Sequence, residues 1–211
     1  KAERIALSKT LKDFGVEPTA EVLGRYHVIN KMHWEKLERK ELDRDGVLVG
    51  RFQVLFQELG LDVDARAVMK QYEQNLGIGH YFIDGAEELL QTLYGKYKMY
   101  VVSNGTANVQ DRRLKSAGIG KYFEKIFISE RVGHNKPSKE FFDAALSQIE
   151  GFDRDSAVLV GDSLTSDILG GINAGIKTCW FNPHGKQPRP DIQPDYEIKS
   201  LSELPKLLEK L

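Results

Sequence analysis

Apolar residues recur at helical spacing through the first eighty residues of the chain. Three stripes have apolar positions three or four residues apart, which is the spacing of one helix face. They are Leu7, Leu11 and Phe14; Val22, Tyr26 and Ile29; and Leu48, Phe52, Leu55 and Leu59. A fourth amphipathic segment covers residues 64–75. Four amphipathic helices without a strand between them predict a small helical bundle over residues 1–80.

From about residue 81 onward, short apolar runs alternate with amphipathic helical segments. Each run is predicted to form a buried strand. The runs are Met99–Val102, Ile126–Ile128, Ala157–Val160, Thr178–Phe181 and Tyr196–Ile198. Strands that alternate with helices predict a parallel sheet with helices on both faces. The expected fold class is therefore α/β, with a doubly wound parallel sheet over residues 81–211 after the helical bundle.

Charge and cysteine content narrow the class of protein. The formal net charge of −1 over 211 residues gives no electrostatic footprint for a nucleic acid polymer or an acidic membrane. No apolar run is long enough to span a membrane, and no signal peptide is recognised. The single cysteine, Cys179, excludes a disulfide within the chain, which suits a reducing cytoplasm. Because Cys179 lies in an apolar run, we expect it to be a core residue rather than a nucleophile.

Two carboxylates follow the apolar run Ala157–Val160. We expect Gly161 to turn the chain out of the strand, which leaves Asp162 at a carboxyl end, where open α/β sheets carry their chemistry. Asp167 falls in the first turns of the next helix. Taken alone, Asp162 could be a turn residue and Asp167 a residue that starts a helix, with no further function. Together they offer the oxygen ligands that Mg²⁺ takes in proteins.

Two other predicted strands also end in polar groups. Ser103, Asn104 and Gly105 follow one of them with a hydroxyl and turn N–H donors, and Lys136 lies in the loop after another. A lone turn serine or a lone lysine is usually structural. Hydrogen-bond donors, a cation and metal-binding carboxylates at neighbouring strand ends are the groups that bind a phosphoryl group in proteins. The three strand ends together therefore predict a phosphoryl site.

The helical bundle carries weaker candidates. His27 and His33 are six residues apart, so they do not share a helix face and are not expected to bind one metal. Asn30 and Trp34 are four apart and do share a face. Ordinary packing explains Trp34 and surface exposure explains Asn30. We keep both as candidate residues for substrate selection.

These residues resemble the motifs of the haloacid dehalogenase (HAD) superfamily. Ser103-Asn104-Gly105 resembles its second motif, Lys136-Pro137 its third, and Gly161-Asp162 with Asp167 its fourth. Residues 1–80 resemble the family's α-helical cap, and residues 81–211 its α/β core. The segments 128–133 and 166–175 resemble the branch that contains bacterial pyrimidine 5′-nucleotidases.

The resemblance implies a magnesium-dependent phosphatase of small phosphomonoesters that works through an aspartyl-phosphate. Pyrimidine nucleoside 5′-monophosphates are the expected substrates, and no macromolecular partner or oligomeric state is implied. Asp162 is expected to bind Mg²⁺ directly and Asp167 to orient the water ligands of the metal. The expected phosphate-binding residues are Ser103, Asn104, Gly105 and Lys136.

The resemblance also makes an expectation about the start of the chain. In that family the nucleophile is an aspartate of a first motif, Asp-x-Asp-x-Thr or Val, on a strand that precedes the cap. The 211 residues do not contain this motif. By family topology the strand lies between those that end at Val102 and Val160, and its loss would leave buried edges unpaired. We therefore expect roughly twenty further residues before Lys1, enough for one strand and its turn.

Several other functions are compatible with the same motifs. A phosphatase of sugar phosphates and a phosphomutase would use the same metal carboxylates. A 2-haloacid dehalogenase needs no metal, so the presence of both Asp162 and Asp167 argues against it. In a different class, the chain could be a binding or regulatory relic without a nucleophile. A relic has no physical reason to keep Ser103, Lys136 and both carboxylates.

Overall fold

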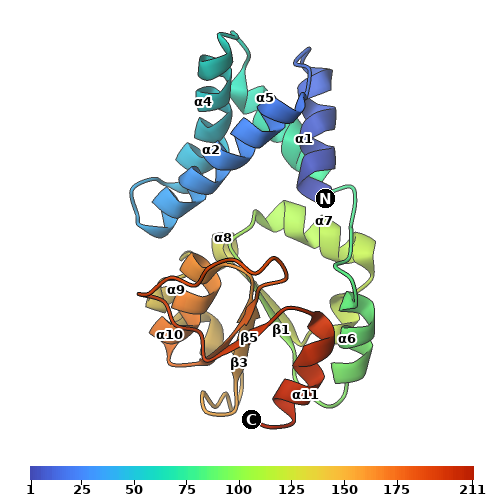
Figure 1. Cartoon of the computed structure of the whole chain (residues 1–211), viewed down its shortest axis with the longest axis vertical. Coiled ribbons are helices and arrows are strands. Elements are labelled where there is room, and N and C mark those ends of the chain that lie inside the picture. Colours follow the sequence, from blue (N-terminus) through green and yellow to red (C-terminus); the bar gives the residue numbers. More distant parts are fainter. The chain divides into compact units, whose positions relative to one another are not determined.

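The computed structural model describes all 211 residues, which divide into two compact units (Figure 1). A helical unit comprises residues 1–81 and 108–118. An α/β unit comprises residues 82–107 and 119–211. The inclusion of residues 108–118 in the helical unit was not predicted from the sequence, because periodicity identifies a helix without saying what it packs against.

The helical unit is built on the predicted apolar stripes. Its helices are α1 (Ala2–Asp13), α2 (Ala20–Glu38), α3 (Arg44–Leu48), α4 (Gly50–Leu59), α5 (Ala65–Leu76) and most of α7 (Ala107–Ala117). Leu11, Tyr26, Ile29, Phe52 and Leu55 from the stripes are all buried in one core. The short helix α3 was missed. It begins where the Asp43 carboxylate accepts a hydrogen bond of 2.7 Å from the N–H of Gly46, a capping signal that the apolar pattern does not contain.

Two of the histidines of this unit, His27 and His33, lie on α2 and differ in burial. His33 is buried, and its Nδ1 lies 2.8 Å from the carbonyl oxygen of Ile29. His27 is exposed on the same helix. Trp34 is half-buried and packs against the core of the unit, whereas Asn30 is half-buried in a polar network described below.

A buried polar contact joins α1 to α5 inside this apolar core. The Asn75 amide donates to the Thr10 hydroxyl at 2.9 Å, and that hydroxyl donates to the carbonyl oxygen of Ala6 at 2.8 Å. Thr10 is fully buried and Asn75 nearly so. Each buried group therefore has a partner, and the contact fixes how the two helices align.

The α/β unit confirms the predicted mixed fold with parallel strands. Its elements are α6 (Ala86–Leu93), β1 (Tyr100–Ser103), η1 (Gly120–Tyr122), β2 (Lys125–Ile128), α8 (Ser129–Val132), α9 (Lys139–Leu146), β3 (Val158–Gly161), η2 (Leu164–Ile168), α10 (Leu169–Ala174), β4 (Lys177–Phe181), β5 (Tyr196–Ile198), η3 (Leu201–Glu203) and α11 (Leu204–Leu208). The strands form two sheets, β1–β2 and β3–β4–β5, and every pair within them is parallel. β1 and β3 do not pair with each other.

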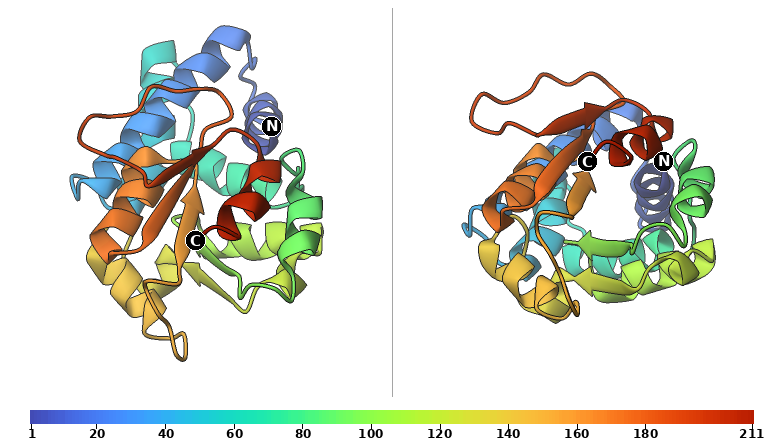
Figure 2. Two further views of the ribbon diagram at one scale, coloured as in Figure 1. Left: turned by 60° about the horizontal axis from the view of Figure 1, so that its bottom comes forward. Right: turned by 90° about the horizontal axis from the view of Figure 1, so that it is seen from below.

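Helices cover both faces of the central strand β4, as a doubly wound sheet requires (Figure 2). Cys179 and Phe181 pack in one cluster with residues of α6 and α11. Trp180, whose side chain points the opposite way, packs with Ile168 of η2 and with Leu169 of α10. The alternation of buried residues on one strand thus reflects a helical layer on each side.

Close packing of α10 explains its paired glycines. A Cβ on Gly170 would lie 2.6 Å from the Phe142 ring, and one on Gly171 would lie 2.5 Å from the Thr178 methyl group. These glycines therefore allow the close packing of α10. No helix of the chain is both long and apolar enough to cross a bilayer.

Removal of the Thr10 hydroxyl tests the buried contact of the helical unit. Thr10→Val keeps the side-chain volume and leaves the buried Asn75 donor without its acceptor. We expect the free energy of unfolding to fall by roughly 1–3 kcal/mol, measured by chemical denaturation. Thr92→Val is the matched control, because Thr92 makes a similar bond to the carbonyl of Glu88 on an exposed helix face. A change of less than about 0.5 kcal/mol is expected there, and equal losses in both variants would refute the assignment.

Cys179 is expected to be unreactive in the folded protein. Its side chain is fully buried on β4, and burial raises the pKa of the thiol to about 11, with a smaller contribution from the charge of Glu203. At pH 8 a thiol-reactive dye should label the denatured chain readily, since an ordinary thiol with a pKa near 8.5 is about one quarter ionised at that pH. The native chain should label only at the rate at which it unfolds. Rapid labelling of native protein would contradict this picture.

Candidate functional site

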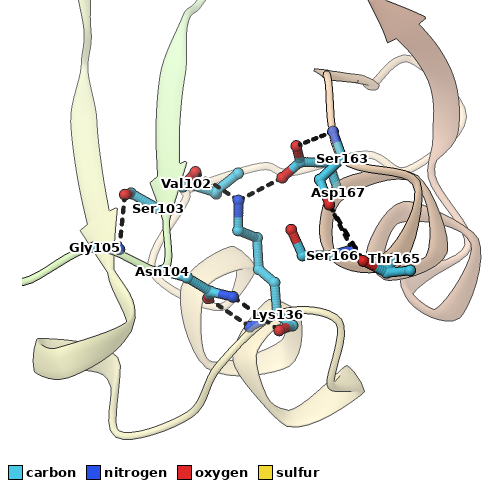
Figure 3. Close-up of polar contacts among 9 residues, drawn as sticks. All are labelled: Val102, Ser103, Asn104, Gly105, Lys136, Ser163, Thr165, Ser166 and Asp167. Carbon is cyan, nitrogen blue, oxygen red and sulfur yellow. Dashed lines mark hydrogen bonds and ion pairs between the residues drawn. The ribbon is translucent and has the colours of Figure 1, made fainter. Parts of the chain in front are cut away.

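The end of β1 is tied to the loop that carries Lys136 (Figure 3). The side-chain oxygen of Asn104 accepts a hydrogen bond of 2.8 Å from the N–H of Lys136, and its amide nitrogen donates at 2.9 Å to the carbonyl of the same residue. The hydroxyl of Ser103 accepts from the N–H of Gly105 at 3.1 Å. The sequence predicted that Ser103 would follow the strand. In the structure it is instead the last residue of β1. The three residues therefore hold the strand end and the loop in one conformation.

Lys136 forms a buried ion pair with Asp167. Its Nζ lies 2.6 Å from Asp167 Oδ1 and donates a second hydrogen bond of 3.0 Å to the carbonyl of Val102 at the end of β1. The side chains of the pair are only 6% and 13% exposed. An ammonium group has three N–H donors, so one remains for a ligand. The ion pair links β1 to η2, which follows β3 in the other sheet.

Asp167 is held by a donor on each of its oxygens. Oδ1 accepts from Lys136, and Oδ2 accepts a hydrogen bond of 3.1 Å from the N–H of Ser163. The Ser163 hydroxyl in turn accepts from the N–H of Ser166 at 3.2 Å and caps the π-helical turn η2. Two charge-assisted hydrogen bonds fix the carboxylate in one orientation.

The reason for a glycine at position 161 differs from the expectation. Gly161 does not turn the chain; it is the last residue of β3 and pairs with Trp180 of β4. A Cβ at this position would overlap the side chain of Asp167. Gly161 is therefore required for space, because the Asp167 carboxyl group lies directly against the strand end.

Asp162 directly follows the last residue of β3. The residue is exposed, and its carbonyl oxygen accepts a hydrogen bond of 3.2 Å from the indole N–H of Trp180. Its carboxylate makes no hydrogen bond to the protein. It lines a cavity of about 460 Å³ in the α/β unit, together with Asp84, Asn182 and Lys199. Asp162 is therefore placed to bind a ligand.

The structure places the predicted residues of the α/β unit at strand ends and in the loops beside them. Asn104, Lys136 and Asp167 are joined by direct contacts, whereas Asp162 is joined to none of these three. No cluster of three or more His, Cys, Asp and Glu side chains in the chain is arranged to hold a metal ion. Magnesium needs no such cluster, since it binds one or two carboxylates, keeps several waters and takes oxygens from a phosphate. Asp162, whose carboxylate makes no hydrogen bond to the protein, fits the part of a direct ligand. Asp167, whose two oxygens already accept hydrogen bonds, fits the part of a residue that orients water ligands.

Two residues that shape these regions, Ser163 and Arg51, were not predicted from the sequence. The N–H of Ser163 orients Asp167, but a backbone contact of this kind has no sequence signal. Arg51 is 4% exposed in the helical unit and donates to Asn30. Its signal was available, because Arg51 lies on the apolar face that Leu48 and Leu55 define, at helical spacing.

Introduction of a methyl group at position 161 tests the close approach of Asp167. Gly161→Ala is expected to displace Asp167 and to lower the free energy of unfolding by roughly 1–3 kcal/mol, as overpacking does, measured by thermal or chemical denaturation. Gly120→Ala is the control, since a Cβ there meets nothing within 4 Å and the backbone is not left-handed. A Gly161→Ala variant as stable as this control would contradict the packing described.

Comparison with known proteins identifies a family whose model matches the chain and relatives that are similar along most of its length. The model of the haloacid dehalogenase-like hydrolase family matches residues 13–181. The chain is 36% identical to the pyrimidine 5′-nucleotidase PynA of Streptococcus pneumoniae, with 99% of this chain and 89% of that protein covered. It is 35% identical to the pyrimidine 5′-nucleotidase YjjG of Escherichia coli, with 96% and 89% covered.

A solved structure agrees in fold as well as in sequence. The HAD-hydrolase YfnB of Bacillus subtilis, in a crystal form described as bound to magnesium, superposes with a TM-score of 0.94 at 38% identity. The superposition covers 98% of this chain and 91% of that one. With the family model matched over most of its length and relatives above 30% identity along nearly all of it, the chain belongs to the haloacid dehalogenase-like hydrolase family.

Proposed function

We propose that the protein is a magnesium-dependent phosphatase that hydrolyses pyrimidine nucleoside 5′-monophosphates. The observation that carries the proposal is the buried pair of Lys136 and Asp167 at the strand ends, with the exposed residue Asp162 five positions before Asp167. These groups supply a cation for phosphoryl oxygens and carboxylates for a metal. The names of the relatives PynA and YjjG support the choice of substrate.

In this proposal the α/β unit binds the phosphate and the helical unit is the cap that selects the leaving group. The remaining N–H of Lys136 donates to a phosphoryl oxygen, and the Ser103 hydroxyl with the turn at Asn104 and Gly105 holds the others. Asp162 would bind Mg²⁺ directly and Asp167 would orient the water ligands of the metal, which would neutralise negative charge on the phosphate. Asn30 and Trp34 are the proposed substrate-selecting residues of the cap.

The reaction proceeds through an aspartyl-phosphate in this proposal. A carboxylate oxygen attacks phosphorus and the ester P–O bond breaks. A carboxylic acid then protonates the departing alkoxide, and water later cleaves the acyl phosphate. The family resemblance assigns the attacking aspartate to the first motif, so we assign that role to none of the residues named here. Lys136 is needed because an anionic nucleophile and an anionic phosphate repel each other until a cation lies between them.

Neutralisation of Asp162 tests the proposal. Asp162→Asn keeps the size of the side chain and removes the charge that would bind the metal. We expect the rate of magnesium-dependent phosphate release from uridine 5′-monophosphate to fall at least about a hundredfold. The assay uses the full-length protein. Asp191→Asn is the control, since Asp191 is an exposed carboxylate of the same unit that pairs with Arg189. Turnover by Asp162→Asn close to that of the control would sink the metal assignment.

A further inference from the structure

A buried arginine without a contacting carboxylate lies in the helical unit. Arg51 of α4 is 4% exposed and makes no ion pair. Its guanidinium donates to the Asn30 side-chain oxygen at 2.7 Å and to the carbonyl of Leu48 at 3.3 Å. The rings of Tyr26, Phe52 and Tyr72 surround it, with centroids 5.9, 5.3 and 5.2 Å from Cζ respectively. Buried charges are normally paired, so the ring faces and the Asn30 oxygen take the place of a counter-ion.

Asn30 of α2 lies between Arg51 and a carboxylate. Its oxygen accepts from Arg51, and its amide nitrogen donates to Glu3 of α1 at 3.0 Å. A guanidinium can only donate and a carboxylate can only accept. The reversed amide would therefore face a donor with a donor and an acceptor with an acceptor. The two charged neighbours fix which end of the Asn30 amide is oxygen, although an asparagine amide flips easily in other settings.

The fixed amide keeps bonding capacity for a ligand. An asparagine amide has two N–H donors and two acceptor lone pairs, of which these contacts use one each. Asn30 is half-buried, so the side chain is not sealed within the core. One N–H and one lone pair therefore remain, with their positions set by Glu3 and Arg51.

Stability alone does not account for this cluster. The Tyr26 hydroxyl is buried and makes no hydrogen bond of good geometry, with only the side chain of Tyr72 beside it as a polar partner. Burial raises the pKa of Tyr26 to about 12, against the opposing effect of the Arg51 charge, so the ring stays neutral. A buried hydroxyl without a hydrogen bond of good geometry and an arginine without a contacting carboxylate are both unfavourable. Such groups are kept where they set the geometry of something else.

We propose that Arg51 and Glu3 are positioning residues that fix Asn30 so that it distinguishes uracil and thymine from cytosine; this rests on the proposed function. Uracil and thymine present an N–H donor at N3 and an acceptor at O4. Cytosine presents an acceptor at N3 and an amino donor at N4. An amide held in one orientation matches one of these two patterns, whereas an amide that flips matches both.

Kinetics on two nucleotides test the proposal. We expect kcat/KM for uridine and cytidine 5′-monophosphates to differ at least about tenfold in the wild type, the selectivity of a good polar pair. In Glu3→Gln and Arg51→Gln the charged neighbour becomes an amide that can itself flip. Their ratios should move to within about threefold of one, through KM rather than kcat. Arg51→Lys keeps a donor-only neighbour and should retain the preference.

Arg25→Gln is the matched control. Arg25 joins α2 to α4 through an exposed pair with Glu58, so it links the same two helices without touching Asn30. Its ratio should equal that of the wild type. If the cluster is merely structural, Glu3→Gln and Arg51→Gln will lower the unfolding temperature and leave the ratio unchanged, which overturns the proposal. A wild-type ratio near one overturns it as well. Should Arg51→Gln fail to fold, Glu3→Gln decides.

A binding measurement separates this proposal from the proposed function. Uridine and cytidine, which carry no phosphate, are titrated into the wild type and Glu3→Gln by calorimetry. A preference in the wild type that Glu3→Gln abolishes supports the fixed amide even if no phosphate is released from either nucleotide. Phosphate release with no nucleoside preference supports the phosphatase and refutes the role of Arg51 and Glu3.

Discussion

The buried ion pair between Lys136 and Asp167 is the constraint on which the α/β unit depends. Two charges at 6% and 13% side-chain exposure lose most of their hydration, and their attraction offsets that loss only if the geometry is good and the other polar atoms are bonded. Each neighbouring feature meets one of these conditions. Val102 accepts a second bond from Lys136, and the N–H of Ser163 occupies the second oxygen of Asp167. Gly161 makes room for the carboxyl group itself.

The ion pair also joins strand ends that belong to two different sheets. β1 and β3 belong to separate sheets and share no backbone hydrogen bonds. Lys136 contacts the end of β1 through Val102 and contacts η2 through Asp167. Parallel strands point their carboxyl ends the same way, so polar groups after them gather at one edge. The lysine then sets the distance between the two ends, which is the dimension that a phosphoryl group would have to match.

The sequence predicted those parts of the molecule that follow from periodicity and from strand ends. Parallel strands, helices on both faces of the sheet and polar groups at the carboxyl ends all came from local patterns. What was not predicted depends on contacts that neither the apolar pattern nor the position of a strand end encodes. The need for Gly161 arises from a side chain six residues later. The role of Asn104 depends on the backbone of Lys136, and the assignment of α7 to the helical unit depends on packing. Arg51 is the exception, because a charged residue on an apolar helix face can be recognised from the sequence.

Asn104 and Asn30 are both held in one orientation by hydrogen bonds, but the groups that hold them differ. Asn104 is oriented by the N–H and the carbonyl of a single residue, so its amide fastens a loop to a strand end and sets where Lys136 begins. Asn30 is oriented by two charged side chains from different helices, and its amide stays half-buried. In both cases a donor-only and an acceptor-only neighbour remove the freedom of the amide to flip. A backbone clamp cannot be changed by substitution of its side chain, whereas a clamp of Glu3 and Arg51 can be. The selectivity proposed for Asn30 should therefore respond to substitution of Glu3 or Arg51, while the loop that Asn104 holds stays as it is.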